Sequence, residues 1–186
     1  MDTSKEIIDI VDENDKVIGQ VDRDIAHRDG LKHRHTHVWL FNRQGQIIFQ
    51  RRSKTTHSNP GYLDASAGGH LPSGMSYIDA ALMELEEEAG IKAKPEDLIF
   101  LGKVKYEATE PSRNVINDTF CEEYAYGYEG KLEDLKPEEG FKFEAWSVDE
   151  VFNGNKSIQE QFIPVFFQEP WSSILRTVQK LAKENG

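Results

Sequence analysis

The chain has 186 residues, of which 38% are hydrophobic and 30% charged, and its formal net charge is −11 at pH 7. These values are typical of a globular protein with its own core, and we expect one domain over residues 1–186. The acidic excess argues against binding to nucleic acid or to an anionic membrane, because both repel a polyanion. A small anionic molecule remains compatible, since all six histidines lie within the first 70 residues, near several arginines.

Nothing in the sequence predicts a membrane span or export. No run approaches the about 18 consecutive apolar residues that a spanning helix needs. Residues 1–6, MDTSKE, are polar and lack the apolar region of a signal peptide. Cys121 is the only cysteine, which excludes an intramolecular disulfide. We therefore expect a cytoplasmic protein, and its oligomeric state stays open, with a homodimer among the alternatives.

The first third of the chain predicts two β-hairpins. Apolar runs at 7–11 and 17–21 flank the turn DENDK, and runs at 38–41 and 46–50 flank NRQG. A loop rich in glycine and proline follows and extends to Gly74.

The clearest helix is predicted from Ser76 to Ala89. Ser76 and Asp79 resemble a capping box at its start, and Gly90 supplies a stop. At about 100° per residue, apolar side chains fall on one stripe, which we expect to be buried. That stripe consists of Ile78, Ala81, Leu82, Leu85 and Ala89.

Later segments predict strands at 98–106, 119–128 and 141–147, a helical turn at 148–152 and a closing amphipathic helix at 170–184. Together the elements predict an α+β fold. We expect an α/β/α sandwich with a mixed β-sheet between helices.

Three carboxylates crowd a second stripe of the predicted helix. Glu84 lies three and four residues before Glu87 and Glu88, and like charges at such spacing cost about 0.2–0.5 kcal/mol per pair. A solvated surface is one explanation. A bound cation is the other, since carboxylate oxygens suit Mg²⁺ and Mn²⁺. The glycine-rich loop before the helix favours the cation, because glycine lets the backbone approach a ligand closely.

Residues 69–91, GHLPSGMSYIDAALMELEEEAGI, resemble the Nudix box, G-x5-E-x7-R-E-U-x-E-E-x-G-U, where U is aliphatic. The matching positions are Gly69, Glu84, Leu85, Glu87, Glu88, Gly90 and Ile91. The resemblance implies a Nudix fold in which Glu84, Glu87 and Glu88 are catalytic and bind Mg²⁺ or Mn²⁺. It also implies hydrolysis of a diphosphate-containing small molecule.

Two positions depart from the box. Met75 replaces its first glutamate and Met83 its arginine, and a thioether can replace neither group at a Mg²⁺ site. A catalytically impaired diphosphate-binding or interaction module is therefore an alternative.

Further stretches resemble the isopentenyl-diphosphate isomerase-like branch of Nudix proteins, over roughly residues 6–150. They are IDIVDE (8–13), HRDGLKH (27–33), WLFN (39–42), QRRSK (50–54), PGY (60–62) and YEATEPS (106–112). The resemblance implies that His27, His33 and His70 bind metal, because they fall on the three histidine positions of the isomerases, apart from one deleted residue.

Isomerase chemistry itself is disfavoured. Gly68 stands where the isomerases carry a catalytic cysteine, and proton transfer at carbon needs an acid or base there. Ile116 and Asp118 align approximately with two metal-binding glutamates, and Cys121 is interpreted as an ordinary strand residue.

Arg51, Arg52 and Tyr106 are the predicted substrate-binding residues. The two arginines end a strand, so alternation directs at most one of them to the ligand, where a guanidinium can bind phosphate oxygens. A solvated charge at the strand end is the alternative. The sequence leaves open whether the histidines reach the same cavity as Glu84 and Glu88.

Overall fold

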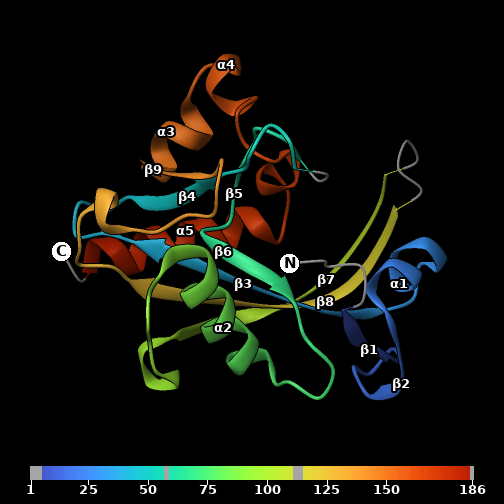
Figure 1. Ribbon diagram of the computed structural model, residues 1–186. Coiled ribbons are helices and arrows are strands. Elements are labelled where there is room, and N and C mark those ends of the chain that lie inside the picture. The colour runs from blue at the N-terminus through green and yellow to red at the C-terminus, as the bar shows by residue number, and fades with distance from the viewer. Residues whose placement is uncertain (1–5, 57–58, 111–114, 185–186) are drawn as a thin grey trace.

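The computed structural model describes residues 6–56, 59–110 and 115–184. Within them, one mixed sheet is built around the long strand β3 (His33–Phe41) (Figure 1). The parallel strand β8 (Val115–Gly127) pairs with the whole length of β3. Three shorter antiparallel strands also pair with β3, each over a different part; they are β1 (Ile7–Val11), β6 (Ala67–His70) and β4 (Ile47–Arg51).

The remaining strands extend the sheet outward. β2 (Val17–Asp22) pairs with β1, and β7 (Ile99–Glu110) pairs with β8. β5 (Leu63–Asp64) and β9 (Lys142–Trp146) both pair with β4. The predicted β1–β2 hairpin is confirmed.

β3 begins at His33, five residues before the predicted start at residue 38. Its first half reads HRHTH, so polar residues occupy both faces and hide the apolar alternation that marks a strand. The short helix α1 (Arg23–Asp29) was not predicted. It has seven residues, with Asp22 as its N-cap and Gly30 as its C-cap.

Helices cover both faces of the sheet, which confirms the predicted sandwich. The helix α2 (Tyr77–Ala89) packs on the face formed by Val38, Leu40 and Ile48. The helices α3 (Val148–Asn153) and α5 (Trp171–Glu184) pack on the opposite face, in a cluster with Trp39. Burial of each large apolar side chain contributes about 1.5–3 kcal/mol.

Shorter helical segments include α4 (Lys156–Gln159) and two 3-10 turns at Pro95–Asp97 and Leu132–Asp134. A further 3-10 turn, Pro164–Phe167, buries Phe166 against the α5 side. No helix among the described residues is both long enough and apolar enough to cross a membrane.

The ends of α2 are as predicted. Ser76 is the N-cap, and its hydroxyl accepts from the Asp79 backbone N–H over 3.3 Å. Gly90 ends the helix with a φ of 72°, a left-handed conformation that favours glycine.

His57, and the Pro111-Ser112 end of the isomerase-like stretch, lie outside the described residues.

Candidate functional site

The helix α2 presents Glu84 and Glu88 to the backbone of β6. The backbone N–H of Gly68 donates to Oε2 of Glu88 over 3.0 Å. A Cβ on Gly69 would overlap the Glu84 carboxylate, so only glycine permits this approach. Both glutamates are half-buried, whereas Glu87 lies farther round the helix and is exposed.

The two carboxylates are held close together with little compensating charge. Burial, and then the charges of Glu88 and Glu87, raises the pKa of Glu84 to about 8. Burial also raises the pKa of Glu88 to about 7, against the opposing effect of the Gly68 hydrogen bond. The positive charge of Arg52 lowers the pKa of Glu88. The Arg52 guanidinium itself forms an ion pair with Asp64, over 3.0 Å. A crowded set of hard oxygen donors fits a divalent cation such as Mg²⁺ or Mn²⁺.

His27 on α1, His33 on β3 and His70 on β6 form a second group of metal-ligand type. Their ligand atoms all lie within 4.8 Å of one another, and the Nε2 atoms of His27 and His70 are 3.0 Å apart. Nδ1 of His33 lies 2.8 Å from the Leu31 carbonyl, and its Nε2 is buried with no hydrogen-bond partner in the described chain. Such a carbonyl contact fixes the ring with Nε2 free to bind metal.

Burial keeps these three imidazoles neutral at pH 7, the form that binds metal. It lowers the pKa of His27 to about 4, with His33 as the next cause. Burial also lowers the pKa of His33 and, more strongly, that of His70.

The sheet face that carries His33 also carries His35 and His37, the next odd-numbered residues of β3. His35 is in register with Cys121 on β8, and His37 with Glu123. Glu123 is completely buried; its Oε1 lies 3.0 Å from Nδ1 of His37, and Trp39 Nε1 donates to its Oε2 over 2.6 Å.

The ionisation of this group follows from its burial. Burial raises the pKa of the Cys121 thiol to about 12, so the thiol is neutral at pH 7. Burial on its own would lower the pKa of His37, yet that pKa stays well above its usual value. With Cys121 neutral, the Glu123 carboxylate is the charge that holds the proton on His37.

The acidic and histidine groups lie on opposite faces of β6. Gly69 faces Glu84, and Ala67 packs with Leu85 of α2. Gly68 and His70 face the other way. A Cβ on Gly68 would lie 2.6 Å from Cδ2 of His37. The ring centroids of His70 and His33 are 5.2 Å apart. The six residues predicted as metal ligands therefore do not form one site. The structure joins Glu84 with Glu88, and separately His27 with His33 and His70.

The two arginines diverge, as alternation predicts. Each of the three guanidinium nitrogens of Arg51 donates to a protein oxygen, on Glu144, Gly61 or Gln161. These bonds compete with a phosphate for the Arg51 guanidinium, and phosphate binding by Arg51 stays a prediction. Of the two arginines, Arg52 is the one whose charge lowers the pKa of Glu88.

Tyr106 belongs to the histidine face. It is in register with Thr119, which is in register with His33. Its ring packs edge-on against Trp171 of α5, with centroids 4.9 Å apart. It therefore lies across the sheet from Glu84.

Some residues that shape the two groups gave no signal in the sequence. The charge of Glu138, in the loop before β9, raises the pKa of both Glu84 and Glu88. The approximate alignment of Ile116 and Asp118 with two metal-binding glutamates stays a prediction. The pairing of β8 with β3 starts one residue later, with Thr119 in register with His33. Asp118 accepts from Lys32 over 2.5 Å.

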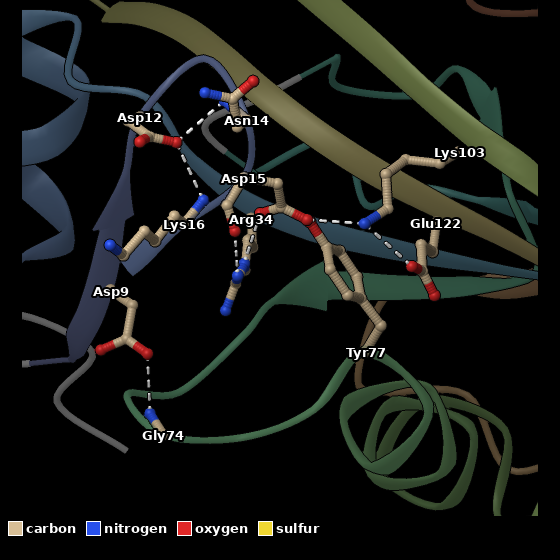
Figure 2. A network of polar contacts seen from close by, with 10 residues as sticks. All are labelled: Asp9, Asp12, Asn14, Asp15, Lys16, Arg34, Gly74, Tyr77, Lys103 and Glu122. Atoms are coloured by element: carbon tan, nitrogen blue, oxygen red, sulfur yellow. Dashed lines mark hydrogen bonds and ion pairs between the residues drawn. The ribbon is translucent and has the colours of Figure 1, made fainter. Parts of the chain in front are cut away.

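A polar network fixes the loop that leads into α2 (Figure 2). Asp9 on β1 accepts from the Gly74 backbone N–H over 2.9 Å and from the Ser73 hydroxyl over 2.7 Å. Asp15, in the β1–β2 turn, accepts from Tyr77 at the start of α2 over 3.0 Å. The β1–β2 hairpin thus holds the first turn of α2, and with it the position of Glu84.

Comparison with known proteins agrees with this architecture. The NUDIX domain family matches residues 31–166, which is most of the chain. The chain belongs to the Nudix family. An uncharacterized Nudix hydrolase of Clostridium acetobutylicum is 36% identical over 132 residues, covering 69% of this chain and 63% of that protein. Another, from Streptomyces coelicolor, is 44% identical over 95 residues, covering 51% of this chain and 52% of that protein.

Solved structures share the Nudix fold. DR0079 from Deinococcus radiodurans aligns with a TM-score of 0.68 at 22% identity, over 93% of this chain and 99% of that chain. The MutT protein from Methanosarcina mazei aligns with a TM-score of 0.58 at 18% identity, over 82% of this chain and 96% of that chain. At such identities the likeness concerns the fold alone. The match to the first two curated relatives spans between half and two thirds of their length.

Proposed function

We propose that the chain is one Nudix domain over residues 1–186 that hydrolyses a diphosphate-containing small molecule with Mg²⁺ or Mn²⁺. The observation that carries this proposal is the convergence of Glu84 and Glu88 on the Gly68–Gly69 backbone. Two half-buried carboxylates with raised pKa values need a compensating cation. A diphosphate brought to them needs one as well.

In this proposal Glu84, Glu87 and Glu88 hold the ion. When bound, it neutralises charge on the diphosphate and lowers the pKa of an attacking water. The Gly68 N–H orients Glu88, and the glycine at 69 gives Glu84 room beside the strand. Arg52, which also pairs with Asp64, is placed to meet a phosphate on this side, since its charge lowers the pKa of Glu88.

The two departures from the Nudix box set the expected rate. Met75 and Met83 are both half-buried and offer no charge. Without the box's first carboxylate and its arginine, the remaining glutamates bind the ion with less support. We therefore expect slower turnover than a complete box would give, and the non-catalytic alternative corresponds to no turnover at all.

The test is phosphate release from a panel of nucleotide and isoprenoid diphosphates with Mg²⁺ or Mn²⁺. Glu87→Gln and Glu88→Gln should each lower kcat by about 100-fold or more, because each removes a charge from the ion site. Glu86→Gln is the matched control, since Glu86 is an exposed neighbour on α2 whose partner is Lys92. No release from any substrate, or equal rates in all three variants, refutes the proposal.

A second candidate is an isopentenyl-diphosphate isomerase-like metal site at His27, His33 and His70. The specific observation is their convergence with a buried Nε2 on His33 that has no partner in the described chain. Three imidazoles favour a transition metal such as Zn²⁺ or Mn²⁺ over Mg²⁺.

Gly68 counts against isomerisation at this site. A Cβ there would lie 2.6 Å from both His37 Cδ2 and the Thr36 carbonyl oxygen, so the isomerase cysteine has no room. Deuterium exchange from solvent into a five-carbon diphosphate measures the activity directly. We expect none, and exchange above the background of heat-denatured protein would restore the isomerase hypothesis.

A further inference from the structure

A second group of metal-ligand type lies beyond the His27–His33–His70 group, and the proposed hydrolysis does not use it. It consists of His35 and His37 on β3 and Cys121 on the neighbouring parallel strand β8. Residues two apart on a strand face the same side, and His35 is in register with Cys121, so the backbone alone brings the three side chains together.

The distances between their donor atoms match those around one tetrahedral ion. Sγ of Cys121 lies 3.5 Å from Nδ1 of His37 and 3.9 Å from Nδ1 of His35, and all three atoms lie within 4.8 Å of one another. Zinc bonds of about 2.3 Å to sulfur and about 2.05 Å to nitrogen separate the two ligand atoms by about 3.6 Å at a tetrahedral angle. Both imidazoles turn the same nitrogen, Nδ1, toward the sulfur.

The Glu123 carboxylate lies beside this group. Oε1 of Glu123 lies 3.0 Å from Nδ1 of His37, and its other oxygen is fixed by Trp39 Nε1. Glu123 and Trp39 are fully buried, and Cys121 is 2% exposed. A buried carboxylate is costly unless a cation or hydrogen bonds compensate it, and His35 and His37 are only partly exposed.

We propose that His35, His37 and Cys121 bind Zn²⁺ and so join β3 to β8, with the Glu123 carboxylate beside the ion. Two nitrogens and a thiolate suit Zn²⁺ rather than Mg²⁺, which prefers oxygen alone. On binding, the Cys121 thiol and the His37 imidazolium each release a proton to solvent, so the ion replaces protons as the partner of Glu123. With three protein ligands one position is left for water, and the ion stabilises the fold by joining two strands.

Cobalt(II) tests the site in the full-length protein, because it takes zinc's place and is coloured. Since Cys121 is the only cysteine in the sequence, a thiolate-to-cobalt charge-transfer band in the near ultraviolet reports this site alone. We expect the band to saturate as Co²⁺ is added, to disappear when Zn²⁺ is added, and to be absent from urea-unfolded protein. A wild-type protein without the band at several equivalents of Co²⁺ overturns the proposal.

Variants separate this site from its neighbours. Cys121→Ser and His37→Ala should remove the band, whereas His27→Ala should keep it, since His27 belongs to the other histidine group. Glu87→Gln should also keep it, because the acidic group lies across β6. Zinc should raise the urea midpoint of wild type more than that of Cys121→Ser. Equal midpoint shifts in the two proteins would mean that the thiol and the His37–Glu123 ion pair pack without metal, and the site would be rejected.

Discussion

The two faces of β6 carry opposite chemistry within four residues. On the α2 face, Gly69 leaves room for the carboxylate of Glu84. On the other face, His70 joins His27 and His33. One strand therefore separates hard oxygen donors from nitrogen donors, and each face suits a different class of cation. Gly69 and His70 are adjacent in the sequence yet serve different groups, because successive strand residues point to opposite sides of the sheet.

The largest expected effect comes from adding one methyl group to the acidic face. Gly69→Ala places a Cβ where the Glu84 carboxylate lies, so this carboxylate must move away from β6. We expect diphosphate hydrolysis with Mg²⁺ to fall by about 100-fold or more in kcat/KM, the cost of misplacing a group that binds the ion.

The adjacent substitution is the control for that result. A Cβ at Gly68 would meet His37 and the Thr36 carbonyl on the other face, so Gly68→Ala should lower the free energy of unfolding by about 1–3 kcal/mol. Its effect on hydrolysis should be smaller than that of Gly69→Ala. If both variants hydrolyse equally well, the two faces are not functionally distinct.

The next largest effect is expected at the histidine group. His70→Ala removes one of three converging imidazoles, and we expect its affinity for Zn²⁺ or Mn²⁺ at this group to fall by about 10–100-fold. Hydrolysis with Mg²⁺ should change by less than about threefold, since hard oxygen donors hold that ion. Isothermal titration of the metals and steady-state rates measure the two effects. A parallel loss of hydrolysis would show that both faces serve one reaction.

The smallest effect is a pH dependence of the metal-free protein. The pKa of Glu84 is raised to about 8 and that of Glu88 to about 7 in the folded chain. The folded state thus binds more protons than the unfolded state between about pH 4.5 and 8, so stability is highest at the acidic end and falls as pH rises. The slope should be at most about 1.4 kcal/mol per pH unit for each carboxyl.

Urea unfolding in a chelator, repeated from pH 5 to 8, measures this slope. Glu84→Gln should flatten it, because the amide does not titrate, and saturating Mg²⁺ should flatten it in wild type. The His27–His33–His70 group contributes in the opposite direction, since the pKa values of these three histidines are lowered. A slope unchanged in Glu84→Gln would place the titrating groups elsewhere.

Much of the acidic face could be read from the sequence. Helical periodicity predicted α2, and Ser76 and Gly90 predicted its ends, because caps and periodicity are local properties. The Nudix box marked Glu84 and Glu88 as site residues, although their approach to the Gly68–Gly69 backbone was not predicted. Alternation also predicted that Arg51 and Arg52 would diverge, although not which of them would approach Glu88.

The sequence by itself determined α2, most of the longer strands, the family and the residues worth examining. It could not determine which of those residues meet, because meeting depends on strand register between segments that are far apart in the chain. His37 and Glu123 are 86 positions apart and come together through the parallel pairing of β3 with β8. That pairing made Cys121, which the sequence presented as an ordinary strand residue, a neighbour of two histidines. Only the tertiary structure decided that the histidines and the glutamates lie on opposite sides of one strand, since burial on both faces fixes the register.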